Sequence, residues 1–205
     1  MPNSGVSSAA KNIKKDLRFP ENYGIIDNMN GKNNNYNPLG KTLHDVEEAK
    51  RSLNYEVGTL ISPDGKVIKE YIGEAHIVSI SDIDNSLFDG NIFTHNHPAG
   101  RCFTRKDIQS FIAGHLREAR ISTPQGIFFS LKESNGEINR AIVNIMKEEK
   151  VGDMAKAAQI LEEKGLDLSG VERENKIYDI MGEEVDKWLS ENAKEFGYIY
   201  TKGEI

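Results

Sequence analysis

The sequence predicts an α+β fold that is followed by a helical C-terminal extension. Three observations lead to this prediction: apolar residues at helical spacing from residue 42, several strand-like runs between residues 56 and 131, and helical spacing again beyond Glu137. Helices and strands that follow one another without a regular βαβ alternation are typical of α+β domains. We therefore divide the chain into an N-terminal arm (1–41), a domain (42–135) and a helical extension (136–205).

The first helix is expected to begin at Thr42, because Thr42 and Asp45 resemble a capping box. Apolar residues then recur at helical spacing as far as Leu53, where the helix should end. The preceding arm contains six asparagines between Asn28 and Asn37 and lacks apolar periodicity, so most of it reads as an arm or loop.

Two strand-like runs, residues 56–62 and 66–73, flank Pro63-Asp64-Gly65 and predict a β-hairpin. A further strand is expected over residues 76–80. The run NIFTHNHP (91–98) has an apolar start and an abrupt proline end, which favours a strand that places His95 and His97 at its C-terminal edge.

Thr104 is expected to cap a helix whose apolar face extends to Ala119, and a strand should follow at residues 126–131. Beyond Glu137 the pattern is helical to about Asn192, with breaks at Gly152, Gly165 and Gly170. The tail 196–202 reads as one short strand.

The net charge of −6 disfavours binding to nucleic acid, which depends on many contacts between basic side chains and phosphates. The single cysteine, Cys102, excludes an intramolecular disulfide and a cysteine-rich zinc site. We find no signal-peptide pattern and no run of about 18 apolar residues. The sequence therefore predicts an intracellular, cytoplasmic protein.

The segment THNHPAGRCFTRKD (94–107) contains the residues with metal-binding chemistry. Side chains alternate along a strand, so His95 and His97 should point to the same side and meet one ion. Asp107 falls in the first turn of the next helix, where the helix dipole favours its ionised form. Two imidazoles and one carboxylate leave a fourth tetrahedral position for water, as in catalytic zinc sites.

Each fragment of this segment also has a plain structural interpretation. Thr104 and Asp107 match an ordinary capping box, and histidines beside a proline can be turn residues. We expect capping of the Thr104 amide and metal binding to compete for Asp107. The two preceding histidines favour the ligand role.

The segment resembles the JAMM metallopeptidase signature: a glutamate on an early strand, then H-x-H, a short spacer and S-x-x-D. The signature occurs in deubiquitinase-like isopeptidases, prokaryotic JAB proteins and RadC proteins. The resemblance covers about residues 42–131 and implies a JAB/MPN-like (cytidine deaminase-like) mixed sheet flanked by helices. It also implies Zn²⁺ as the cofactor, with His95, His97 and Asp107 as ligands.

The resemblance assigns Thr104 to the position that stabilises the oxyanion. The match departs from the family in two respects: threonine replaces serine there, and the spacer from His97, six residues, is one residue shorter than usual. A looser similarity links THNHP to JAB-like segments of phage head-morphogenesis proteins.

Glu56 is the best candidate for the general base that such a site needs. It opens the first hairpin strand, where the resembled family has its catalytic glutamate, although a glutamate at a strand start is more often a solvated edge residue. Glu70 and Glu74 are the substitutes if Glu56 does not face the metal.

Three other features receive structural interpretations. His115 is expected to be a packed core residue on the 104–119 helix, and a nucleophilic role for Cys102 is disfavoured because nothing nearby lowers its pKa clearly. A set of basic residues reads as a solvated helix rim or as an attraction for an acidic substrate. This set comprises Arg101, Arg105, Lys106, Arg117 and Arg120.

The leading hypothesis is therefore a zinc-dependent peptidase or isopeptidase that hydrolyses a peptide or Lys-linked amide, with a ubiquitin-like conjugate as one candidate substrate. We expect the substrate to be an extended segment paired to a sheet edge beside the site. The alternative is a non-catalytic JAMM-like binding module of a phage or defence assembly. No membrane partner is expected, and the oligomeric state cannot be inferred.

Overall fold

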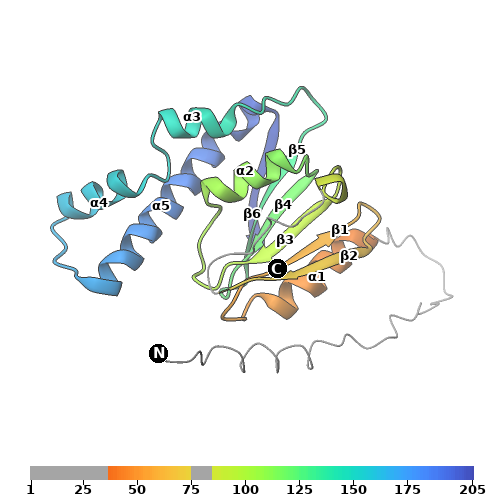
Figure 1. Ribbon diagram of the computed structural model, residues 1–205, viewed down its shortest axis with the longest axis horizontal. Coiled ribbons are helices and arrows are strands. Elements are labelled where there is room, and N and C mark those ends of the chain that lie inside the picture. The colour runs from red at the N-terminus through yellow and green to blue at the C-terminus, as the bar shows by residue number, and fades with distance from the viewer. Residues whose placement is uncertain (1–36, 75–84) are drawn as a thin grey trace, which may run out of the picture. The chain divides into compact units, whose positions relative to one another are not determined.

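A six-stranded mixed β-sheet organises the part of the chain that the computed structural model describes, residues 37–74 and 85–205 (Figure 1). The strand order is β2-β1-β3-β4-β5-β6, and all neighbours are antiparallel except β3 and β4, which are parallel. The strands are β1 (Val57–Ile61), β2 (Val67–Ile72), β3 (Ile92–Asn96), β4 (Glu118–Ser122), β5 (Ile127–Glu133) and β6 (Tyr198–Glu204). This arrangement confirms the α+β class.

Helices cover both faces of the sheet. The α-helices are α1 (Pro38–Lys50), α2 (Arg105–Ala113), α3 (Ile142–Glu148), α4 (Met154–Glu163) and α5 (Gly170–Asn192), with short 3-10 turns η2 (Asn85–Leu87) and η3 (Ala193–Phe196). Helix α1 lies on one face, and α2, α3 and α5 pack into the main core on the other (Figure 1). Within the described ranges, no helix combines the length and apolar content needed to cross a membrane.

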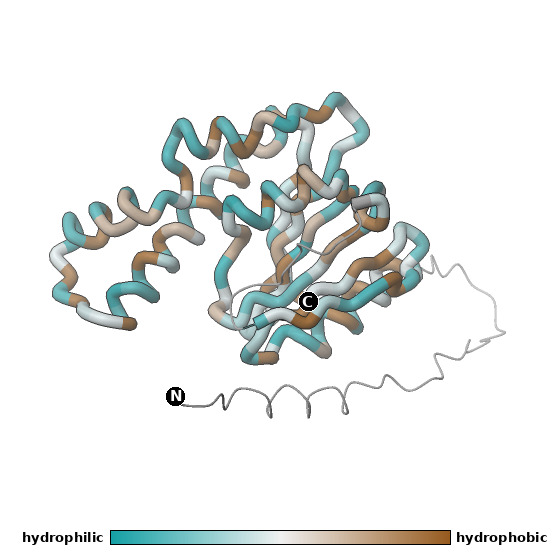
Figure 2. The backbone as a smooth tube through the Cα atoms, in the orientation of Figure 1, coloured by the Kyte–Doolittle hydropathy of each residue, from teal (hydrophilic) through white to brown (hydrophobic). Residues whose placement is uncertain are grey.

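Alternation along the strands divides the core between the two faces. Ile61 and Ile92 pack under α1, whereas Leu60 and Phe93, one residue earlier or later, belong to the larger cluster under α2. Figure 2 shows hydrophobic residues along the strands of the sheet. In β1 and β3, whose residues are buried throughout, the period of two therefore assigns each residue to one of two buried environments.

The capping-box pattern suggested that helix α1 begins at Thr42, but the helix begins at Pro38. The Asn37 side chain accepts a hydrogen bond from the Gly40 amide at 3.1 Å, and Pro38 occupies the first helical turn, where its missing N–H costs nothing. The Thr42 hydroxyl instead donates to the Gly65 carbonyl at 2.8 Å. The helix ends at Lys50, before Leu53.

The predicted hairpin is confirmed, with Gly65 at φ +88° in its turn. The strand predicted to place His95 and His97 is also confirmed, although it ends at Asn96, one residue before His97. The strand expected at residues 76–80 and residues 1–36 of the expected arm lie outside the described residues.

The prediction of one helix from Thr104 to Ala119 is wrong. Helix α2 ends at Ala113, His115 adopts φ +51° in the following turn, and β4 begins at Glu118. His115 is exposed and is not a core residue. Leu116 and Ala119 have the spacing of a continuing helix. Strand β4 was not recognised, because its charged residues do not show the alternation of apolar and polar residues that is typical of a strand.

The C-terminal segment contains the expected helices, and Gly152, Gly165 and Gly170 adopt positive φ at the predicted breaks. The short strand predicted near the end is confirmed as β6, which pairs with β5. The segment also contributes Trp188 and Tyr198 to the main core. It is therefore part of the same fold as the sheet and not a separate extension.

A buried ionic network lies between α1 and the sheet. Arg120 binds Glu47 with two hydrogen bonds, of 2.6 and 2.9 Å, and Glu118 at 3.1 Å. Thr94 donates to Glu47 at 2.9 Å and Ser130 donates to Glu118 at 2.7 Å. Arg120 is therefore not part of a solvated basic rim, and the polar face of β4 is buried because its charges are paired.

We predict that Glu47→Ala lowers the free energy of unfolding by about 3–5 kcal/mol, because it leaves the Arg120 guanidinium buried without its main partner. Urea unfolding followed by circular dichroism measures this loss. Glu48→Ala is the matched control, because Glu48 pairs with Arg51 at the surface and its removal should have a far smaller effect. Equal losses in the two variants would contradict a structural role for the network.

Candidate metal centre

Strand β3 directs its alternate side chains to opposite faces of the sheet. Thr94 and Asn96 point toward α1 and the segment that follows it, whereas Phe93 and His95 face the side of α2. His97 follows the strand end, and its amide donates to the Ser122 carbonyl at 2.9 Å, which continues the pairing with β4. The two histidines therefore lie on the same side of the sheet, as predicted.

His95, His97 and Asp107 converge on one point. The two Nε2 atoms are 2.9 Å apart, Asp107 Oδ1 is 3.6 Å from His95 Nε2, and Asp107 Oδ2 is 3.7 Å from His97 Nε2. Two ligand atoms of a tetrahedral zinc ion are about 3.4 Å apart, since each lies about 2.1 Å from the metal. The observed distances bracket this value, so the cluster can hold a metal ion.

The ring of His97 is oriented by the backbone. Its Nδ1 lies 3.0 Å from the Arg101 carbonyl oxygen, which can only accept, so Nδ1 bears the hydrogen and the Nε2 lone pair points into the cluster. Burial, together with the neighbouring His95, lowers the pKa of His97 to about 4. His97 is therefore a neutral imidazole, the form that binds metals.

Asp107 supplies a negative charge to the cluster. Burial disfavours the charged form of its carboxyl, but His95, His97 and the Thr104 amide outweigh burial and lower its pKa. Burial also disfavours protonation of His95, yet the adjacent carboxylates of Asp107 and Glu56 raise the pKa of His95. The cluster thus contains a carboxylate that favours a cation. Without a metal, part of this negative charge is balanced by the interaction with His95.

Asp107 caps helix α2 while it faces the two histidines. Asp107 Oδ2 accepts from the Thr104 amide at 2.6 Å and from the Thr104 hydroxyl at 2.7 Å, which completes the capping box. Asp107 Oδ1 remains directed at His95. The cap therefore fixes the carboxylate in the orientation that the cluster needs.

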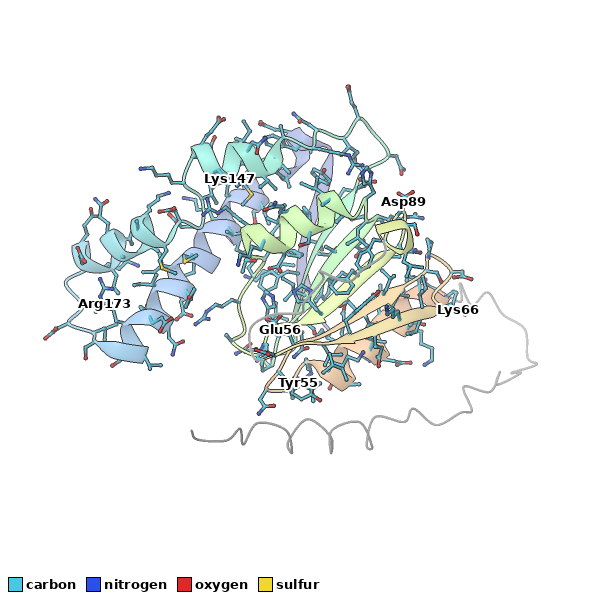
Figure 3. The ribbon with its side chains drawn as sticks, viewed as in Figure 1. Tyr55, Glu56, Lys66, Asp89, Lys147 and Arg173 are labelled. Carbon is cyan, nitrogen blue, oxygen red and sulfur yellow. The ribbon has the colours of Figure 1, made fainter. Side chains whose placement is uncertain are left out.

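Glu56 lies on the same face of the sheet as His95. Its backbone continues the β1 ladder, because its amide donates to Glu74 and its carbonyl accepts from Gly73. By alternation its side chain shares the face of Gly58, which is the cross-strand partner of His95. Glu56 is buried, its charge acts on His95, and Figure 3 shows it at the start of β1.

The two substitute glutamates have other positions. Glu70 pairs with Lys50 on the α1 face, and Glu74 is exposed beyond the end of β2. Of the three candidates, Glu56 alone combines burial with an electrostatic effect on His95.

Sequence reasoning missed two residues that position the site. Asn96 accepts from the Val57 amide at 2.7 Å and donates to the Tyr55 carbonyl at 2.9 Å, so it holds both neighbours of Glu56. The sequence could have indicated Asn96, because a residue between two strand histidines points to the opposite face of the sheet. A buried amide on that face must find hydrogen-bond partners there. Arg101, whose carbonyl orients His97, had no such signal, since a backbone contact leaves no trace in residue type.

The remaining candidates near the site do not form a second reactive group. Cys102 is buried, its Sγ lies 3.1 Å from the Tyr200 hydroxyl, and burial raises its pKa to about 12, which disfavours the thiolate. Arg101 and Arg105 form ion pairs with Asp179 and Asp153. Three members of the predicted basic set, Arg101, Arg105 and Arg120, are thus paired with separate acidic residues, whereas Lys106 and Arg117 are exposed.

Comparisons of the chain with protein-family models, with curated proteins and with solved structures found no match. The interpretation of the site therefore rests on its geometry alone. It is a buried cluster of two histidines and one aspartate, which are residues that could hold a metal ion.

We predict that the purified protein contains about one transition-metal ion per chain and that His97→Ala loses it, because two ligands bind far more weakly than three. Elemental analysis of both proteins gives the answer. His115→Ala is the control, since His115 is exposed on the turn after α2 and should not affect the metal content. Equal metal in wild type and His97→Ala would remove His97 from the ligand set.

Proposed function

We propose that the chain is a zinc-dependent peptidase or isopeptidase with a JAMM-like centre on a JAB/MPN-like fold. The observation that carries the proposal is the convergence of His95, His97 and Asp107 with Glu56 on the same sheet face. Two imidazoles and one carboxylate are a donor set typical of catalytic zinc. The mixed sheet with helices on both faces is compatible with this fold.

In this proposal His95, His97 and Asp107 would hold zinc and would leave a position for water. A bound zinc ion polarises an amide carbonyl and lowers the pKa of water. Glu56 acts as the general base: it takes a proton from the attacking water and returns it to the leaving amine. The burial of Glu56 and its electrostatic effect on His95 support this role.

Thr104 is the proposed oxyanion donor by its position in the signature. Its hydroxyl hydrogen is directed at Asp107 Oδ2, and its oxygen accepts from the Asp107 amide at 3.2 Å. To stabilise an oxyanion, the hydroxyl must turn away from Asp107 in the substrate complex. The exposed position of Thr104 leaves room for that rotation.

The position of β3 changes the expected route for an extended substrate. The sequence suggested a sheet edge beside the end of β3, but β3 is internal and pairs with β1 and β4. The described edge on the Glu56 side is β2, whose exposed side chains include Val67, Ile68 and Ile72. We therefore propose that an extended segment pairs with β2.

We predict that Glu56→Gln retains the metal but lowers the rate of hydrolysis about 100-fold or more, because the amide keeps the size of the side chain and cannot accept a proton. Metal content and turnover are measured on the same preparation. Glu74→Gln is the matched control, since it makes the same change at an exposed glutamate of the neighbouring strand end. Wild-type turnover by Glu56→Gln would transfer the base role to another residue.

We further predict that wild type cleaves a peptide or isopeptide bond in an extended, flexible segment and that Glu56→Gln does not. Mass spectrometry of products follows incubation with ubiquitin-like conjugates, linear peptides and unfolded polypeptides. Full metal occupancy without any product specific to wild type would favour the alternative, a JAMM-like binding module that does not catalyse hydrolysis.

A further inference from the structure

Helix α5 holds the loop that connects the two parts of the metal centre. This loop, residues 97–104, runs from the end of β3 to the start of α2. The Arg101 guanidinium donates to Asp179 at 3.0 Å and to the Asn175 carbonyl at 3.2 Å. It also lies over the ring of Tyr178, 5.3 Å from the ring centroid. One side chain thus makes three kinds of contact with a single helix.

The loop also packs directly on α5. A Cβ added at Gly182 would lie 3.6 Å from the Arg101 Cβ and 3.8 Å from the Cys102 amide nitrogen, which is ordinary van der Waals contact, so the helix backbone lies close to the loop. Next to this contact, the Tyr200 hydroxyl lies 3.1 Å from Cys102 Sγ and donates to Asp186 of α5 at 2.6 Å. The loop is therefore fixed over two consecutive residues.

The backbone of Arg101 contacts the metal centre itself. Its carbonyl oxygen, 3.0 Å from His97 Nδ1, sets both the tautomer and the direction of the imidazole ring. The same residue therefore binds α5 through its side chain and a metal ligand through its main chain. A shift of the side-chain anchor would move the acceptor that orients His97.

We propose that Arg101 is a positioning residue that couples helix α5 to the metal ligand His97. The proposal rests on the metal-binding part of the proposed function and is independent of hydrolysis. An ion pair with a partly exposed aspartate adds little to stability, so the contact with Asp179 does not by itself account for the arrangement. The mostly buried guanidinium is held at several points, so the side chain of Arg101 fixes the position of its own backbone. That backbone carries the carbonyl that orients His97.

The test measures the zinc dissociation constant of wild type and Arg101→Ala by competition with a chromophoric chelator. We expect Arg101→Ala to bind zinc about tenfold more weakly, the lower end of the effect of outer-shell partners, because the carbonyl itself is retained. Arg105→Ala is the matched control: it removes a neighbouring arginine with a weaker ion pair, to Asp153, and should keep wild-type affinity. Arg101→Lys should lie in between, since lysine keeps the charge but lacks the planar fork.

Two further measurements separate positioning from general packing. Asp179→Ala should also weaken zinc binding, and the double variant with Arg101→Ala should be no weaker than Arg101→Ala alone, because both changes remove one coupling. The visible spectrum of the Co²⁺-substituted protein should change in Arg101→Ala and not in Arg105→Ala. The thermal midpoint of the metal-free protein should stay within a few degrees of wild type.

Three results would overturn the coupling: zinc affinity of Arg101→Ala within about twofold of wild type, an equal loss in Arg105→Ala, or fully additive losses from Arg101 and Asp179. A loss of affinity in Arg101→Ala that is matched by unfolding of the metal-free protein would assign Arg101 to packing. Failure of wild type to bind zinc would instead refute the proposed metal function, and the coupling with it. Zinc binding without hydrolysis would leave the coupling standing.

Discussion

The central place of β3 in the sheet is the constraint on which the site depends. Because β3 pairs with β1 on one side and β4 on the other, it cannot shift by one residue without turning His95 toward α1. Close packing adds to this restriction: the Phe93 ring lies over Gly58, where an added Cβ would meet it at 2.2 Å. The register that buries Phe93 therefore also places His95 beside the segment that contains Glu56.

The two faces of β3 perform different tasks that support each other. On the α1 face, Thr94 binds Glu47, whose partner Arg120 belongs to β4, and this network holds the parallel pair β3–β4 together. The same strand pair presents the Ser122 carbonyl to the His97 amide. Burying these charges is costly unless they are paired, so each charge of the network depends on its partner.

The C-terminal segment belongs to the site as much as to the core. Strand β6 completes the sheet beside β5, and its Tyr200 reaches the loop that connects the candidate metal ligands. Helix α5 holds the same loop directly through Asp179, and its Asp186 accepts a hydrogen bond from Tyr200. A loop that carries candidate ligands at both ends would need such support, because metal geometry tolerates only small displacements of its donors. The fold meets this need with residues more than 70 positions away in sequence.

The sequence by itself determined the hairpin, the strand that ends at the histidines, and the candidate ligands, because these depend on local spacing and on side-chain chemistry. It misplaced the end of α2 and missed β4, since Glu118 and Arg120 look solvent-exposed in the sequence. Arg120 pairs with both Glu118 and Glu47, and Glu47 lies more than 70 residues earlier. It also treated capping and metal binding by Asp107 as alternatives. Only the tertiary structure decided that one oxygen of Asp107 caps α2 while the other faces His95, because that choice depends on the position of the carboxylate relative to a strand that sequence spacing cannot place.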